Sequence, residues 1–192
     1  MNIRLGALTL AAALATTTVA GAMTLRSPGT PANLPTLTVT SADFTNGGKL
    51  PVSTGFKACG GLNVSPALHW TKGPAKTKSY LVTIFDPDAP TGVGFWHWTL
   101  FDVPASVTHL AKNYGAHPLP PALAGYTDYG LSGYQGPCPP AGDPPHHYHI
   151  TVSALDLATI PGGGAGTTGA VLAFETRGHV LARGEIVGTY QR

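Results

Sequence analysis

Two short segments of the sequence collect side chains that could take part in chemistry. In the first, Asp86-Pro87-Asp88-Ala89-Pro90 follows an apolar run and precedes Trp96-His97-Trp98. Prolines and aspartates together often form a plain turn, in which a carboxylate bonds a nearby backbone N–H group, and we assign that role to Asp88. Asp86 instead shares the parity of the packed residues of the preceding strand. Its charge therefore needs a partner, such as His97 on a neighbouring strand.

The second segment is a loop rich in glycine and proline, Gly133–Pro140, which leads into His146-His147-Tyr148-His149. Glycine lets backbone N–H groups approach an anion closely, and proline restricts the remaining conformations. Strand alternation places His146 and Tyr148 on the packed face. We therefore single out these two residues beside His97, and assign structural roles to the other histidines, which are His69, His109, His117, His147, His149 and His179.

The elements that must position these side chains are mostly strands. Segments rich in Val, Ile, Thr and aromatic residues, separated by turn clusters, predict strands at Leu37–Thr40, Ser79–Phe85, Trp98–Val103, Tyr148–Leu155 and Glu185–Tyr190. Helical signal is weak except over Thr168–Ala182, which contains an unfavourable Gly178, and a short second helix is compatible with Pro104–Leu110. The sum is a β-dominated sandwich or barrel-like domain with small peripheral helices.

Composition agrees with this fold and limits the partners. Charged residues make up 10% of the 192 residues, and the 25 glycines and 18 prolines indicate many turns. The net charge of +2 and the lack of a Lys/Arg run argue against a nucleic-acid partner. The length suits one domain.

The N-terminus resembles an export signal. Arg4 precedes an apolar stretch, and Ala20-Gly21-Ala22 fits an A-x-A cleavage pattern. We expect a signal peptide at 1–22, a linker at 23–36 and the domain at 37–192, with a periplasmic or secreted location and no integral membrane span after cleavage. The alternative is a membrane anchor, for which the stretch is short and weakly apolar.

Export bears on the two cysteines. An oxidising compartment permits a disulfide between Cys59 and Cys138, and the alternative is two buried free thiols.

These residues together resemble the phosphatidylethanolamine-binding family, including its bacterial Raf-kinase-inhibitor-like members. The resemblance rests on Asp-Pro-Asp-Ala-Pro before a histidine at a strand start, followed by Gly-Pro-x-Pro-Pro before His-x-Tyr. It extends to Asn63–Trp70, which is similar to the family's Asn-x-Ser-Pro-x-Leu-x-Trp strand entry, and to Gly178–Ala182 and Gly188–Tyr190 near the end. It covers the chain from about Leu37 to Arg192.

The resemblance implies a Greek-key β-sandwich with one small pocket for phosphate, phosphorylethanolamine-like groups or other small anions. It also implies a candidate cis bond at Ala89–Pro90. Two departures from the family pattern limit the resemblance. The loop contains an added Asp143-Pro144-Pro145 run, and the chain lacks the long C-terminal extension of eukaryotic members. With Trp96 added from its motif, we expect the ligand-binding residues to be Asp86, Pro90, Trp96, His97, Gly136, Pro137, His146 and Tyr148.

The leading functional expectation is a binding protein for an anionic, phospholipid-headgroup-like ligand, without a cofactor, a bound metal or catalysis. An alternative is an inhibitor or interaction protein that presents the pocket rim to a protease or kinase. A third is an acid/base or metal-dependent enzyme using Asp86, His97 and His146. Neither a G-x-S-x-G nor a His-Glu-x-x-His motif supports it. No amphipathic basic helix suggests membrane docking, so we expect lipid contact through the headgroup alone.

Overall fold

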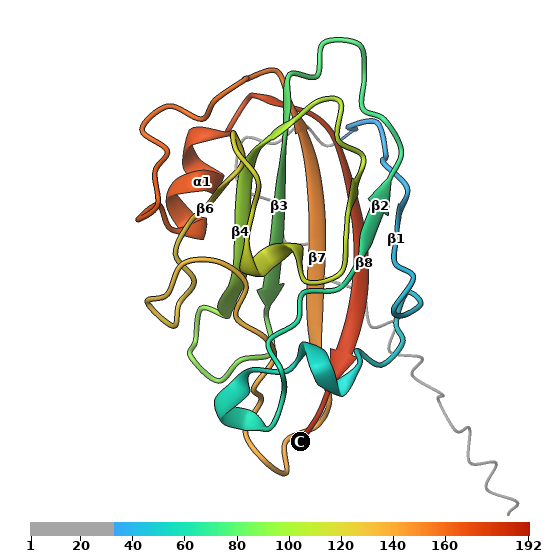
Figure 1. Cartoon of the computed structure of the whole chain (residues 1–192), viewed down its shortest axis with the longest axis vertical. Helices are drawn as coiled ribbons and strands as arrows, with labels where there is room; N and C mark the ends of the chain where they lie inside the picture. Colours follow the sequence, from blue (N-terminus) through green and yellow to red (C-terminus); the bar gives the residue numbers. More distant parts are fainter. Residues whose placement is uncertain (1–32) are drawn as a thin grey trace, which may run out of the picture.

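A computed structural model describes residues 33–192, so the expected signal peptide and most of the expected linker lie outside the described residues. Two antiparallel sheets dominate the structure (Figure 1), which confirms the expected β-rich fold. One sheet has the order β6-β4-β3-β7-β8 and the other the order β1-β2-β5. The strands of the larger sheet are β3 (Ser79–Asp86), β4 (Phe95–Pro104), β6 (Leu123–Ala124), β7 (His146–Leu155) and β8 (Val180–Tyr190). Those of the smaller sheet are β1 (Val39–Thr40), β2 (Leu68–Trp70) and β5 (His109–Leu110).

The main core lies between the two sheets. Trp70 of β2 packs edge-on against Tyr80 of β3 at a ring-centroid distance of 5.4 Å, and both side chains are fully buried. Every second residue of β3, β7 and β8 points into this core, as strand alternation requires. The sandwich therefore rests on the apolar face that the sequence predicts for β3 and β7.

The outer edge of β8 is covered by the N-terminal part of the described chain. The backbone of Arg183 bonds both Pro35 and Leu37, and Thr189 bonds both Gly48 and Leu50. Because unpaired strand edges promote intermolecular pairing, this segment protects the sheet. Pro35 and Thr36, which the sequence assigns to a linker, already belong to this pairing.

The opposite face of the larger sheet is partly covered by α1 (Gly169–Glu175), whose Leu172 is fully buried. Thr168 caps the helix by accepting a hydrogen bond from Val171 N. The helix is shorter than predicted, because Gly178 adopts a φ of +85° and the chain then enters β8 at Val180. No helix forms at 104–110 either, where the chain makes a turn and then β5.

The turn after β3 is built differently from the prediction. The carboxylate that bonds the turn backbone is Asp86, whose Oδ1 accepts from Asp88 N at 2.9 Å. Asp88 instead reaches β7, where its Oδ2 accepts from the backbone N of His147 at 2.7 Å and lies 2.8 Å from His147 Nδ1. Among the described residues only the Pro120–Pro121 peptide bond is cis, so the expectation of a cis bond before Pro90 is wrong.

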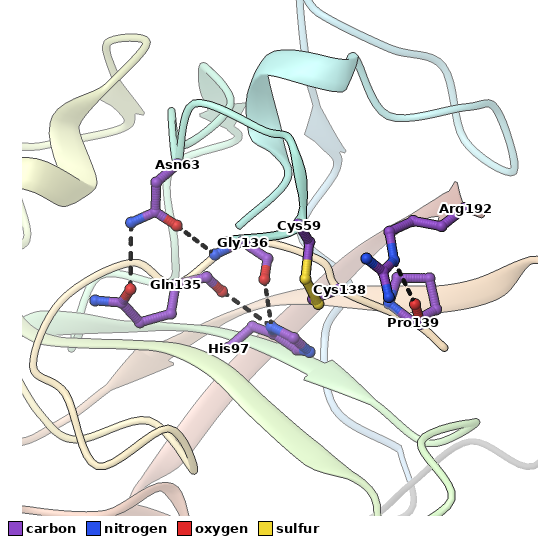
Figure 2. The surroundings of a disulfide bond; sticks show 8 residues. All are labelled: Cys59, Asn63, His97, Gln135, Gly136, Cys138, Pro139 and Arg192. Carbon is purple, nitrogen blue, oxygen red and sulfur yellow. Dashed lines mark hydrogen bonds between the residues drawn. A yellow bond between two sulfur atoms is a disulfide. The ribbon is translucent and has the colours of Figure 1, made fainter. Parts of the chain in front are cut away.

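A disulfide joins Cys59 to Cys138, with the two Cα atoms 5.7 Å apart (Figure 2). Cys59 ends the short 3-10 helix η2 (Lys57–Cys59), and Cys138 lies in the Gly/Pro loop. A backbone hydrogen bond from Phe56 N to Pro137 O, 2.9 Å long, adds to the link. Within residues 33–192, no helix is both long and apolar enough to cross a membrane.

We expect the disulfide to stabilise the fold substantially, because it closes a loop with a sequence separation of 79 residues. The chain-entropy model gives roughly 4 kcal/mol for a loop of that size. The free energy of unfolding, measured with denaturant, should therefore be larger for the wild type than for the Cys59→Ser/Cys138→Ser double variant by about this amount. Two cysteines that alkylate freely in the unreduced protein, as seen by mass spectrometry, would contradict the bridge.

Asp88 should give a small stability contribution that depends on pH. Partial burial acts to raise the pKa of Asp88, but hydrogen bonds from His147 outweigh it and hold this pKa below its ordinary value. A lowered carboxyl pKa stabilises the fold above the unfolded value of about 3.9, and this contribution disappears as pH falls through the folded pKa.

Urea unfolding should thus show Asp88→Asn to be less stable than wild type at pH 7, with the difference shrinking towards pH 3. Because the carboxylate is 41% exposed, we expect a small effect. A difference that stays constant over this range would show that the charge is not responsible.

Candidate functional site

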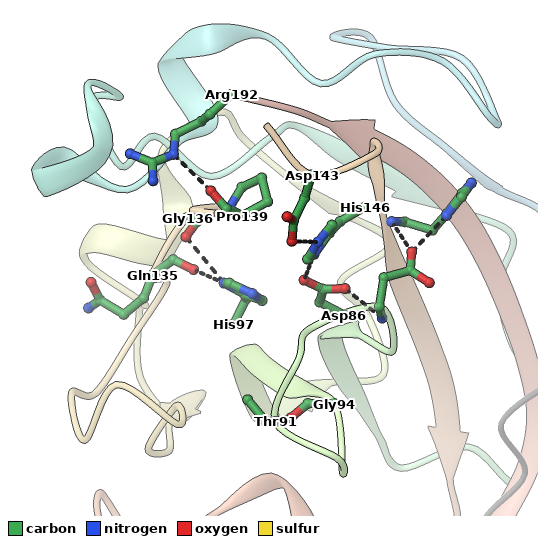
Figure 3. A network of polar contacts seen from close by, with 12 residues as sticks. Asp86, Thr91, Gly94, His97, Gln135, Gly136, Pro139, Asp143, His146 and Arg192 are labelled. Carbon is green, nitrogen blue, oxygen red and sulfur yellow. Dashed lines mark hydrogen bonds and ion pairs between the residues drawn. The ribbon is translucent and has the colours of Figure 1, made fainter. Parts of the chain in front are cut away.

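The predicted residues Asp86, His97 and His146 meet at one end of the sandwich, where β3 ends and where β4 and β7 begin (Figure 3). Asp86 is 2% exposed, His97 3% and His146 4%. Three buried titratable side chains at one sheet end are uncommon, because burial disfavours charge unless a partner is present.

Asp86 is paired with His146, whose Nδ1 lies 2.8 Å from Asp86 Oδ2. The register of β3 with β7 explains the pairing. Phe85 lies opposite His149, so Asp86 continues opposite Tyr148, and His146 is its diagonal neighbour on the same face. The sequence correctly places a histidine next to Asp86, but the partner is His146 and not His97.

His97 enters the site through a β-bulge. Ile84 pairs with Trp98 and Phe85 pairs with Trp96, so His97 is an additional residue in β4 without a partner in β3. A bulge turns the side chains that follow it to the other face of the strand. As a result His97 and Trp98 are both buried on the inner side.

The same bulge moves Trp96 out of the site. Its ring packs against Phe85 at 4.6 Å, and a Cβ atom on Gly169 of α1 would collide with it, so Trp96 lies on the opposite face of the sheet. The sequence-based assignment of Trp96 to the ligand pocket is corrected accordingly. Pro90 is exposed in the turn that follows β3.

The Gly/Pro loop fixes the orientation of the His97 ring. Nδ1 lies 2.9 Å from Gln135 O and 3.2 Å from Gly136 O, so Nδ1 carries the proton (Figure 2). Burial, only partly offset by these carbonyls, lowers the pKa of His97. At neutral pH the ring is therefore neutral, and its unprotonated Nε2 has no hydrogen-bond partner among the described residues.

Gly136 is held by Asn63, whose Oδ1 accepts from Gly136 N at 2.7 Å, while Asn63 Nδ2 donates to Tyr134 O at 2.8 Å. A Cβ atom at Gly136 would collide with Thr54 O, so only glycine fits there. This loop thus contributes carbonyls to His97, whereas the sequence predicts that it offers backbone N–H groups to an anion.

Aromatic rings form the apolar surroundings of the site. Tyr148 and Tyr129 meet the His97 ring edge-on, at 5.1 and 5.8 Å. Burial first, and the Asp86 charge second, raise the pKa of Tyr148 and raise that of Tyr129 to about 12, so both phenols stay protonated. The buried Tyr148 hydroxyl has no hydrogen-bond partner of good geometry within residues 33–192.

The sequence reasoning missed two residues of the site. Tyr129 comes from a loop without any recognisable pattern. Asp143, from the added Asp-Pro-Pro run, lies with Oδ2 3.6 Å from His146 Nε2 (Figure 3). The sequence does offer one signal for Asp143, because this residue stands only three positions before His146.

The arrangement gives each histidine one fixed nitrogen and one available nitrogen. Nδ1 of His97 donates to carbonyls, and Nδ1 of His146 donates to a carboxylate. Each Nε2 can therefore accept a proton from a ligand, or donate to it after protonation. No group of three His, Cys, Asp or Glu side chains within residues 33–192 has an arrangement that could hold a metal ion.

Comparison with known proteins identifies the family that this chain resembles. A family model described as Phosphatidylethanolamine-binding protein matches residues 40–191. The UPF0098 protein YbcL of Escherichia coli (strain K12) is 42% identical over 159 residues, which are 80% of this chain and 86% of that protein. The UPF0098 protein YbhB of the same organism is 41% identical over 155 residues, covering 78% of this chain and 97% of that protein.

Solved structures give the same result. The crystal structure of Escherichia coli YbcL, described as a new member of the mammalian PEBP family, matches with a TM-score of 0.77 at 41% identity. The match covers 81% of this chain and 98% of that one. A homologue from Chlamydia trachomatis matches with a TM-score of 0.71 at 30% identity, over 82% of this chain and 98% of the other. The resemblance inferred from the motifs is thus confirmed, and the chain belongs to the phosphatidylethanolamine-binding protein family, in its bacterial UPF0098/YbcL branch.

Proposed function

We propose that this protein binds a small anionic, phosphate-like group, such as a phospholipid headgroup, at the end of the sandwich formed by Asp86, His97 and His146. The observation that carries the proposal is the pair of buried imidazoles. Each has Nδ1 fixed by the protein, and this leaves Nε2 for a ligand. Charge-assisted hydrogen bonds from imidazolium to phosphate oxygens are the interactions such a pair can make.

The chemistry of the site favours binding over catalysis. Asp86 accepts from both His146 and Asp88 N, so its oxygens are already engaged. Cys138, which lies in the Gly/Pro loop, is bonded in a disulfide. The site thus has imidazoles that can hold an anion once they are protonated, but no activated nucleophile accompanies them among the described residues.

We also propose that the protein is exported. The A-x-A pattern at residues 20–22 predicts cleavage, and a disulfide is stable in the periplasm or outside the cell.

Calorimetric titration of inorganic phosphate and phosphorylethanolamine at pH 6.5 tests the proposal. We expect saturable binding to the wild type and its loss in His146→Ala. Because truncation leaves Asp86 buried without a partner, His146→Gln provides a second variant that keeps a donor for the carboxylate. The His146→Gln variant should fold normally but bind both ligands at least tenfold more weakly than the wild type, which corresponds to about 1.4 kcal/mol.

His179→Ala is the matched control. His179 pairs with Asp156 at 2.8 Å, beyond the opposite end of β7, so its loss should leave binding unchanged. Absence of binding to the wild type and every variant would refute the proposed function. Equal loss in His179→Ala and His146→Gln would show that the effect is not local.

Binding should weaken as the pH rises. The pKa of His97 is lowered by burial, and a neutral Nε2 cannot donate to an anion, so ligand oxygens without protons require proton uptake by the site. Sulfate has no proton to offer between pH 5 and 9. Its affinity should fall by up to about tenfold per pH unit for each proton taken up.

Phosphate can offer its own proton to a neutral imidazole, so its affinity should fall less steeply over the same range. Titrations of both anions at several pH values measure the two slopes. A sulfate affinity that never declines between pH 5 and 9 would contradict the role of the histidines.

A further inference from the structure

Asp143 places a second carboxylate at the site, on the side of His146 that faces away from Asp86. The imidazole therefore lies between two carboxylates, with Oδ2 of Asp86 2.8 Å from Nδ1 and Oδ2 of Asp143 3.6 Å from Nε2 (Figure 3). The two contacts differ in kind. Asp86 is buried and within hydrogen-bond distance, whereas Asp143 is 40% exposed and lies beyond it.

The backbone of the loop keeps Asp143 in this place. Asp143 O accepts from Gln191 Nε2 at 2.9 Å, and Gly142 N donates to Arg192 O at 3.3 Å. Arg192 Nε in turn donates to Pro139 O at 2.8 Å. The end of the described chain thus anchors the loop at Pro139, Gly142 and Asp143.

The Asp143 side chain is held much less firmly than its backbone. Within residues 33–192, the side chain makes one polar contact, the long one to His146. A long contact of a half-exposed carboxylate contributes little to stability, because water screens it. The fold therefore does not depend on this carboxylate, although its position next to Nε2 is fixed by the loop.

Asp143 occupies the direction from which an anion would reach Nε2 of His146. A ligand oxygen bonded to that nitrogen would lie within a few ångströms of the carboxylate, and like charges at such distances repel. A ligand that also carries a cationic group would instead gain a partner at the same place.

We propose that Asp143 is a specificity-determining residue that disfavours compact anions and favours ligands in which a cationic group is joined to the anionic group. The inference rests on the proposed function, because it concerns the same site. It differs from that proposal in predicting that a removed negative charge improves the binding of a bare anion.

The test compares inorganic phosphate with phosphorylethanolamine by calorimetry at pH 6.5 in the wild type and Asp143→Asn. We expect Asp143→Asn to bind inorganic phosphate about tenfold more tightly, which corresponds to about 1.4 kcal/mol. Phosphorylethanolamine should gain much less or lose affinity, because its ammonium group loses a partner. The wild type should therefore prefer phosphorylethanolamine more strongly than the variant does.

Two control variants separate the charge from the loop. Asp143→Glu keeps the charge and should bind phosphate as weakly as the wild type. Asp156 is a matched carboxylate, because it is 39% exposed against 40% for Asp143 and pairs with His179 away from the site. Asp156→Asn should therefore leave the affinity for both ligands unchanged.

The outcomes distinguish the two proposals. Suppose that the wild type binds phosphate and that Asp143→Asn does not bind it more tightly, or that the variant gains affinity equally for both ligands. Either result overturns the role of Asp143 but leaves the binding function intact. Binding of phosphate to Asp143→Asn alone supports the inference in its strongest form. No binding to any variant refutes the function and the inference with it.

Discussion

The buried contact between Asp86 and His146 is the constraint on which the site depends. A carboxylate that is 2% exposed costs several kcal/mol to desolvate unless a partner and hydrogen bonds compensate. The compensation comes from two directions: His146 Nδ1 from β7 and Asp88 N from the turn. The bond from Asp88 N is local to the turn, but His146 lies next to Asp86 only when β3 and β7 pair in the observed register. The geometry of the site thus requires the observed pairing of β3 with β7.

The second half of the site depends on a different device. His97 faces inward because β4 contains a bulge, and its ring is oriented by carbonyls of the Gly/Pro loop. That loop is in turn fixed by Asn63 and by the disulfide from Cys59. Segments far apart in the chain therefore converge on one imidazole. Burial among these segments lowers the pKa of His97 and keeps the ring neutral, and one nitrogen remains available.

The charge balance of the site is not that of a simple anion hole. His146 is flanked by two carboxylates, and the phenols of Tyr129 and Tyr148 remain protonated. An anion that enters must bring or recruit protons, or carry its own positive charge, to avoid repulsion. Membership of the phosphatidylethanolamine-binding protein family is consistent with such a site, and Asp143 adds a second carboxylate to the balance.

The sequence by itself determined the β-rich class, the four longer strands and the family, because alternation, turn residues and short motifs are local properties. It also determined that Asp86, His146 and Tyr148 share a face, since parity follows from strand geometry alone. Only the tertiary structure decided that Trp96 lies on the other face, because a bulge changes parity without a sequence signal. It likewise decided that the helix ends at Glu175, because the chain must enter β8 at Val180 to pair with β7. It also decided the place of Asp143, because residues near the C-terminus hold the loop beside His146.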